Sequence, residues 1–177
     1  MKNLKNLILR VLFVLLLMAD SSSVFAESFS FEITNPKVKI SIPELPKIVM
    51  KPHLLSKTRP HLRYQGSSGS YDLSIITPTA DTGMTPLECA QSTIHDIVKR
   101  RYGLADSEYK AYKADDGKTF ALYYSIRFPP FTQLKAHLIS AASGHCIEVH
   151  ISKVLTSQKE AKNWFGSFPQ ARIQTGK

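Results

Sequence analysis

Three residues near the C-terminal end of the chain have types and a spacing that could support chemistry. Cys146, Glu148 and His150 alternate with apolar residues, so on a β-strand they would share one face. A cysteine beside a base is the pattern of a thiol hydrolase, and sulfur, oxygen and nitrogen are ligands that a zinc-like metal accepts. Strand residues two apart are about 6.6 Å from each other, however, and converge only through long side chains. We therefore expect no catalytic residue and no metal site, and keep a small hydrolase or metal-binding protein as the alternative.

The chain has two cysteines, Cys89 and Cys146, and an exported protein with an even number often oxidises them. A bond between them would close a loop of 57 residues and stabilise the fold by roughly 4 kcal/mol in the chain-entropy model. Cys89 lies off the apolar face of its predicted helix, and Cys146 is out of phase with Ile147 and Val149. Either the sheet is covered on both faces or the thiols do not meet, so the sequence leaves the disulfide open.

Positive charge is concentrated in a proline-rich stretch, residues 36 to 66. It contains five of the ten prolines and a single acid, Glu44. Its basic residues are the partner-binding candidates, because clustered cations attract an anionic partner. These candidates are Lys37, Lys39, Lys47, Lys51, Lys57, Arg59 and Arg63.

A structural interpretation of the same stretch competes with this one, and the alternation of residues favours it. Val38, Ile40 and Ile42 alternate with polar residues, as in a half-buried strand. Proline cannot donate to a ladder, so the stretch should be extended and edge-like rather than helical. Lysines on such an edge strand would discourage edge-to-edge pairing.

Other groups of residues have structural explanations that we prefer to functional ones. Lys99 to Arg101 end a predicted helix, where cations complement the helix dipole. Asp115 and Asp116 lie in a predicted hairpin turn. The third group is aromatic and alternates along a predicted strand: Phe120, Tyr124 and Phe128. These side chains could line the pocket of a small-ligand carrier, which is a further alternative, but aromatic residues at strand spacing usually belong to the core.

Motif searches give no cofactor. The chain has no phosphate-binding glycine loop and no Gly-x-Ser-x-Gly elbow. The histidines at positions 53, 61, 95, 137 and 145 lack the spacing of metal ligands. We therefore expect neither a cofactor nor a metal.

The clearest predicted element is a helix over about residues 86 to 102. Thr85 and Glu88 have the spacing of a capping box, and Pro86 occupies the first helical position. Gly103 supplies the stop. The apolar face consists of Leu87, Ala90, Ile94, Ile97 and Val98.

Antiparallel strands surround this helix in the sequence. A Gly and Ser loop at 65 to 70 precedes a strand at 71 to 77. Further strands are expected at 109 to 114, 120 to 128, about 133 to 142 and 145 to 154, with turns at Asp115-Lys118 and Ser143-Gly144. A second helix, about 158 to 166, begins at a Ser157 and Glu160 capping box, and the tail packs back on the sheet. This order predicts an α+β fold, an antiparallel sheet of about five to six strands packed by two main helices.

The first 26 residues have the pattern of a secretory signal peptide. Lys2, Lys5 and Arg10 precede a nine-residue apolar run, and Val24-Phe25-Ala26 places small residues at a cleavage site. Nine apolar residues are too few for a membrane span, which disfavours a retained anchor helix. We expect a mature protein, periplasmic or secreted, without stable membrane insertion.

Composition then limits the class of protein. Of the 177 residues, 43% are hydrophobic, which is ordinary for one globular domain. We expect a signal peptide at 1-26, an extended basic arm with edge strands at 27-65, and a single α+β domain at 66-177. Without the signal, 20 Lys and Arg face 13 Asp and Glu, a net charge of +7. Nucleic acid is excluded as a partner because export separates the protein from it and no aromatic and basic residues interleave.

The order of elements resembles the PsbP-like fold, which is named for an extrinsic photosystem protein and also occurs in bacterial envelope proteins. The resemblance covers roughly residues 64 to 173. It rests on the strand at 71 to 77, the capped helix after Gly83, the meander from 109 to 154 and the closing Asn163 to Phe168 segment. It implies a mostly non-catalytic docking or accessory protein, and it supplies no active-site motif. The basic arm is not part of the resemblance.

Together these observations predict an exported, non-enzymatic binding or accessory protein. Its expected partner is an acidic protein or another anionic envelope component, which the basic arm would contact. An immunity or inhibitor protein is one concrete form of this expectation. The oligomeric state and the identity of the partner stay open.

Overall fold

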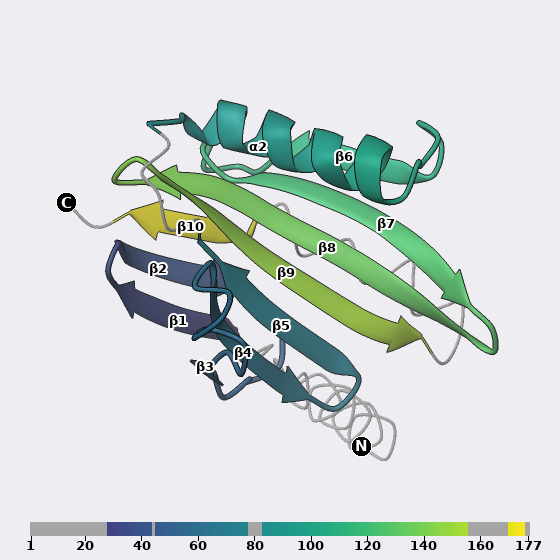
Figure 1. Ribbon diagram of the computed structural model, residues 1–177, viewed down its shortest axis with the longest axis horizontal. Coiled ribbons are helices and arrows are strands. Elements are labelled where there is room, and N and C mark those ends of the chain that lie inside the picture. The colour runs from purple at the N-terminus through teal and green to yellow at the C-terminus, as the bar shows by residue number, and fades with distance from the viewer. Residues whose placement is uncertain (1–27, 44, 78–82, 156–169, 176–177) are drawn as a thin grey trace, which may run out of the picture.

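The computed structural model describes residues 28–43, 45–77, 83–155 and 170–175. These residues form three layers, a helix on one face of a seven-stranded sheet and a three-stranded sheet on the other (Figure 1). The small sheet is antiparallel, and its strand order is β1 (Phe29–Thr34), β2 (Lys37–Ile42) and β10 (Arg172–Thr175).

Seven strands make the larger sheet, and all its neighbours are antiparallel. From edge to edge its strands are β3 (Lys51–Pro52), β4 (Leu62–Ser68), β5 (Tyr71–Ile76), β9 (His145–Leu155), β8 (Phe131–Ala142), β7 (Phe120–Phe128) and β6 (Tyr109–Lys113). The predicted meander is therefore confirmed. The strand number of five to six is wrong, because the arm contributes β3 and the segment before Gly69 contributes β4.

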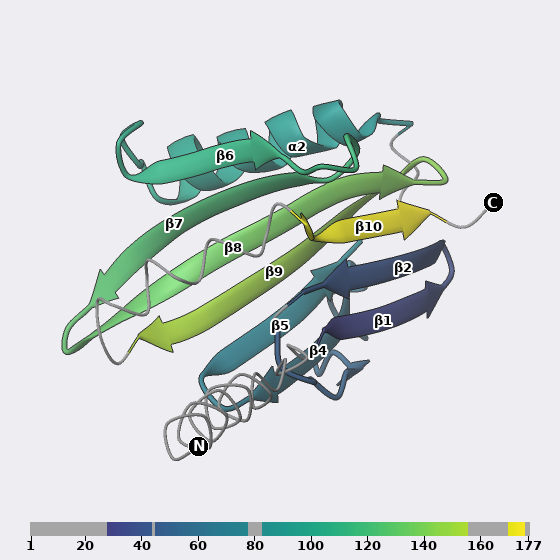
Figure 2. The ribbon, with the colours of Figure 1, turned by 180° about the vertical axis from the view of Figure 1, so that it is seen from behind.

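Alternation along the strands places one main core between the two sheets. Ile40 and Ile42 of β2 are fully buried and pack with Leu73, Leu138 and Val149 of the large sheet. Figure 2, the view from behind, shows the small sheet lying across β5 and β9. Residues of the predicted arm therefore complete the main core, because β1, β2 and the segment with Leu45 and Ile48, together with β10, cover an apolar face of the large sheet.

The predicted helix forms as α2 (Pro86–His95) and continues without a break as the π-helical η1 (Asp96–Arg101). Its capping box is confirmed: the Thr85 side chain accepts from the Glu88 backbone N–H, and Glu88 accepts from the Thr85 backbone N–H. The prediction of the helix's apolar face is partly wrong. Leu87 is 50% exposed whereas Cys89 is fully buried, because the helix is rotated to place the cysteine on the sheet.

Two segments differ from their predicted forms. Residues 65 to 68 belong to strand β4 instead of a loop, and the turn is confined to Gly69 and Ser70. Gly66 suits the strand because a Cβ there would lie 2.6 Å from the Val49 carbonyl oxygen and from a side-chain carbon of Ile48. The expected second helix at 158 to 166 lies outside the described residues.

Strand β2 is the centre of its sheet, with β1 on one side and β10 on the other. The edge-strand interpretation of Lys37 and Lys39 is therefore wrong. That interpretation failed because local patterning does not show that residues 172 to 175 pair with β2. The expectation that the tail packs back on a sheet is confirmed.

No helix in the described part of the chain is long and apolar enough to span a membrane. The predicted signal peptide lies outside the described residues.

Candidate functional site

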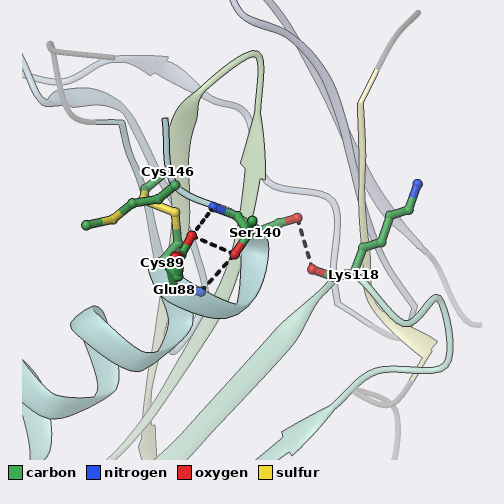
Figure 3. The surroundings of a disulfide bond; sticks show 7 residues. Glu88, Cys89, Lys118, Ser140 and Cys146 are labelled. Atoms are coloured by element: carbon green, nitrogen blue, oxygen red, sulfur yellow. Dashed lines mark hydrogen bonds between the residues drawn. A yellow bond between two sulfur atoms is a disulfide. The ribbon is translucent and has the colours of Figure 1, made fainter. Parts of the chain in front are cut away.

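A disulfide joins Cys89 of α2 to Cys146 of β9, with 5.6 Å between the Cα atoms. It forms because both faces of the large sheet are covered, so a residue out of phase with Ile147 and Val149 still faces a packed layer. Figure 3 shows the bond at the first turn of α2. In the same view Ser140 of β8 donates to the Lys118 carbonyl oxygen at 3.1 Å, which joins the neighbouring strand to the β6–β7 turn.

The disulfide changes what Cys146, Glu148 and His150 can do together. They share one face of β9, as predicted, but Cys146 is bonded to Cys89 and has no thiolate to offer as a nucleophile or a ligand. The side chains of Glu148 and His150 instead interact with His137 on the neighbouring strand β8. Among the described residues, no group of three metal-ligating side chains converges.

A hydrogen-bonded chain of side chains runs across three strands under the helix. Nδ1 of His137 lies 2.6 Å from Oε1 of Glu148, and Nε2 lies 3.0 Å from the Tyr124 hydroxyl. A carboxylate can only accept, so Nδ1 donates to Glu148, and Nε2 of the neutral imidazole accepts from Tyr124. Burial raises the pKa of Tyr124 above its ordinary value, which keeps this hydroxyl protonated and able to donate.

His150 lies beside this chain and stacks on His137 with 4.6 Å between ring centroids. Burial lowers the pKa of His150 well below its ordinary value, and electrostatic interactions with His137, Lys135 and Arg101 lower it further. The imidazole is therefore neutral at physiological pH.

Sequence reasoning missed Tyr124 and His137 as members of a polar cluster, although the turns contain the signal. A two-residue turn at Ser143-Gly144 pairs Ala142 with His145, and this register places His137 opposite His150. The Pro129-Pro130 turn fixes the β7–β8 register in the same way. The two turns together therefore place Tyr124, His137 and Glu148 on neighbouring strands.

The aromatic residues considered for a ligand carrier do not line a common pocket in the described part of the chain: Tyr124 packs against the helix, and Phe128 is exposed. Tyr124 packs with Leu122 against Ile97 and Val98 of η1, so the helix occupies this face of β7. Phe128 is exposed at the β7–β8 hairpin and lies beside Phe131. The turn explanation of Asp116 is confirmed, because its carboxylate accepts from the backbone N–H groups of Lys118 and Thr119.

The seven basic candidate residues do not form one cluster. Lys37 and Lys39 are exposed on the outer layer formed by the small sheet. Lys51 lines a cavity of about 270 Å³ with Asp72, on the strands β3 to β5. Arg59 lines a different cavity beside the helix, described below. The candidates are therefore distributed over both sides of the large sheet.

These seven side chains differ in ion pairing from the basic residues at the end of the helix. Lys99, Arg100 and Arg101 each pair with an acid, Asp106 or Asp96. No ion pair joins any of the seven candidates to a carboxylate in the described ranges, and all but Arg63 are exposed. Arg63 is half-buried and donates to the Asn35 carbonyl oxygen at 3.2 Å. Six uncompensated cations are thus available to solvent.

A cavity of about 450 Å³ lies where the loop before β4 meets the helix. One wall is formed by Arg59 and His61 of the loop, and another by Asp96 and Arg101 of η1. Glu148 lines it as well, so the Tyr124–His137–Glu148 chain ends at this cavity. Hydroxyl and apolar side chains complete the lining: Ser92, Thr93, Leu62, Ile76 and Ile97.

Comparison with known proteins gives a likeness of fold. The chain is similar to the solution structure of cyanobacterial PsbP (CyanoP) from Synechocystis sp. PCC 6803, with a TM-score of 0.51 and 12% identity over 88% of this chain and 96% of that one. No protein-family model and no curated protein matches the chain.

The fold is therefore PsbP-like, as the order of elements predicted. The aligned part of this chain, 88% of its 177 residues, is longer than the stretch from residue 64 to residue 173. It is also longer than all the residues that remain when 27 to 65 are left out. Part of the basic arm is consequently included. This agrees with the position of β2 in the main core.

Proposed function

We propose that this protein is an exported, non-enzymatic binding or accessory protein that recognises an acidic protein or another anionic envelope component through its basic N-terminal region. The observation that carries the proposal is the concentration of exposed cations in one stretch of the chain, residues 37 to 59, which contains a single acid, Glu44. Basic residues of the helix are paired with acids, whereas the basic candidates from Lys37 to Arg59 are exposed and have no ion-pair partner among the described carboxylates. Uncompensated surface charge attracts an oppositely charged partner and raises the rate of encounter.

Export is the second part of the proposal. The disulfide is compatible with an oxidising compartment, where such bonds persist. A signal peptide at residues 1 to 26 would deliver the chain there, to the periplasm or the medium. An immunity or inhibitor protein that neutralises a secreted toxin is one concrete form of such a protein.

The test is capture of partners from an envelope extract by the full mature chain. Changing all seven basic candidates to Ser should abolish the capture, and moderate salt should weaken capture by the unchanged chain, because surface electrostatics are screened. The matched control changes three exposed cations elsewhere, Lys110, Lys113 and Arg127, and should leave capture intact. Unchanged recovery with the seven-residue variant would contradict the proposal.

The enzymatic alternative depended on Cys146 as a nucleophile beside His150. With Cys146 bonded to Cys89, that pair has no thiolate, which favours the binding proposal over a thiol hydrolase. Turnover of an envelope substrate by the purified protein, abolished in His150→Ala, would overturn this preference.

A further inference from the structure

The charged side chains that line the cavity beside the helix differ in whether they have a hydrogen-bond or ion-pair partner. Asp96 is satisfied twice, since one oxygen lies 3.3 Å from Arg100 and the other 3.4 Å from Arg101. Glu148 uses Oε1 to accept from His137 at 2.6 Å. Arg59, on the opposite wall, has no ion pair with a carboxylate in the described ranges. Among the charged side chains that line this cavity, Arg59 is therefore the one for which the described ranges contain no partner.

The loop that contains Arg59 is held in place by its own hydrogen bonds. The backbone N–H groups of Thr58 and Arg59 both donate to the Leu55 carbonyl oxygen, at 3.1 and 2.7 Å, and the His61 carbonyl oxygen accepts from the Thr77 N–H at 2.8 Å. Arg59 is thus presented by a folded turn that is anchored to the end of β5.

We infer that this cavity binds the carboxylate side chain of an acidic residue on a partner protein, with Arg59 and Arg101 as the cationic groups that receive it. The inference rests on the proposed function and assigns one place at which the acidic partner would be recognised. Guanidinium groups bind a planar carboxylate through paired hydrogen bonds, which a lysine cannot do. The hydroxyls of Ser92 and Thr93 line the same cavity and can donate to the bound group.

Formal charge favours a carboxylate over a phosphate. The two arginines of the lining are opposed by two acids, Asp96 and Glu148. A ligand with one negative charge can lie beside the arginines and keep away from Glu148, whereas a phosphate with nearly two charges would be repelled by both acids. The remaining acceptor capacity of Glu148 suits a peptide N–H next to the acidic side chain.

Exposed aliphatic side chains on the same loop favour a protein over an acidic sugar. Leu54 is 85% exposed and Leu55 45% exposed, although leucine is among the residues most often buried. Both lie within five residues of Arg59 on the turn described above. Adjacent apolar and cationic groups match an acidic residue that is flanked by apolar side chains.

The direct test uses a small probe with the mature full chain. N-acetyl-glutamate amide is titrated into isotope-labelled protein, and the amide shifts of Ser92, Thr93 and Ile76 are followed by NMR. We expect saturable shifts there, no saturable shift with the neutral N-acetyl-glutamine amide, and at least about tenfold weaker binding in Arg101→Gln and in Arg59→Gln. Lys37→Gln, on the small sheet, is the matched control and should bind as the unchanged chain does.

Three results would overturn the inference. Absence of saturable shifts with the glutamate probe is one, and equal binding of the glutamine probe is another. Tighter binding of inorganic phosphate or of glucuronate than of the glutamate probe is the third, because the site would then belong to a different ligand class. An unchanged melting temperature of Arg101→Gln shows that the variant is folded, and Arg101→Lys gives a second variant that keeps the charge but loses the paired geometry.

Failure of this inference can be told apart from failure of the proposed function. Arg101 is not one of the seven basic candidates, so Arg101→Gln tests the cavity alone in the envelope-capture experiment. If Arg101→Gln captures as well as the unchanged chain while the seven-residue variant does not, the proposed function stands and the cavity inference falls. If neither variant loses capture, both are overturned.

Discussion

At the scale of single residues, the main polar feature is the chain of hydrogen bonds from Tyr124 through His137 to Glu148. Each group has a defined direction of donation, so the imidazole of His137 is held in one tautomer. Glu148 is consequently fixed where it lines the cavity. The network therefore sets the position of one cavity wall.

Removing one hydroxyl tests the network. In Tyr124→Phe the ring stays but Nε2 of buried His137 loses its donor, so we expect the free energy of unfolding to fall by about 1 to 3 kcal/mol. Tyr109→Phe is the control, because its bond to Asp106 is exposed, and we expect a change of about 0.5 kcal/mol or less. Urea denaturation of the three proteins measures both changes. Equal stability of the two variants would contradict the network.

The low pKa of His150 makes stability depend on pH. Unfolded histidine titrates near about pH 6.5, so between that pH and the lower folded pKa the unfolded chain binds more protons and stability falls as the pH falls. The charged or titratable groups that act on His150 are His137 and Lys135 from β8 and Arg101 from η1. His150→Gln should flatten the loss of unfolding free energy between about pH 7.5 and 5.5.

Urea denaturation at several pH values measures this dependence. The exposed His95 supplies the control, since His95→Gln should lose stability on acidification as the unchanged chain does. A His150→Gln variant with the full pH dependence would show that another group causes it.

At the scale of elements, the helix is tied to the sheet by one covalent bond and by a small apolar contact. Cys89 and Ala90 pack on Ile139, and Ile97 and Val98 pack on Leu122. The disulfide lies near the start of α2, whereas the cavity lies beside η1. The position of the whole helix, and with it that of Arg101, therefore depends in part on the disulfide.

Replacing both cysteines by Ala should lower the free energy of unfolding by about 4 kcal/mol, the value expected for a loop of 57 residues in the chain-entropy model. Hydrogen exchange should show the largest loss of protection in α2. A reductant should destabilise the unchanged chain to a similar extent and leave the double variant unaffected, which is the matched control. A change in stability below about 1 kcal/mol would contradict the structural role of the bond.

At the scale of the whole molecule, sequence patterns predicted local elements far better than their partners. The capping box at Thr85, the β7 to β9 meander and the PsbP-like fold follow from local spacing and element order. The layer formed by β1, β2 and β10 did not, because β10 lies far from β2 in the sequence and no turn connects these two strands. The polar cluster was missed for a different reason: its members come from three strands, and the turns place them together only when the register is followed along each strand.

The same layer predicts which fragment folds. A fragment of residues 66 to 177 lacks β1 to β3 and most of β4, and it exposes Leu73, Ile75 and Val149, which are buried in the whole chain. We expect this fragment to aggregate or to unfold without a cooperative transition, whereas the chain from residue 28 onward unfolds cooperatively. Circular dichroism during thermal unfolding and size-exclusion chromatography distinguish the two. Cooperative unfolding of the fragment would show that residues 66 to 177 are an independent domain.

The position of β2 between β1 and β10 has a consequence for the order of folding. Ile40 pairs with Ile173, so β2, near one end of the described chain, can complete its pairing only after β10, near the other end, has been synthesised. A polypeptide that emerges from a ribosome or a translocation channel with its N-terminus first can form the β1–β2 hairpin early, but one side of that hairpin stays unpaired. The small sheet is thus complete only when β10 pairs with β2. Delayed release of the C-terminal end should therefore prolong a partly folded, aggregation-prone intermediate.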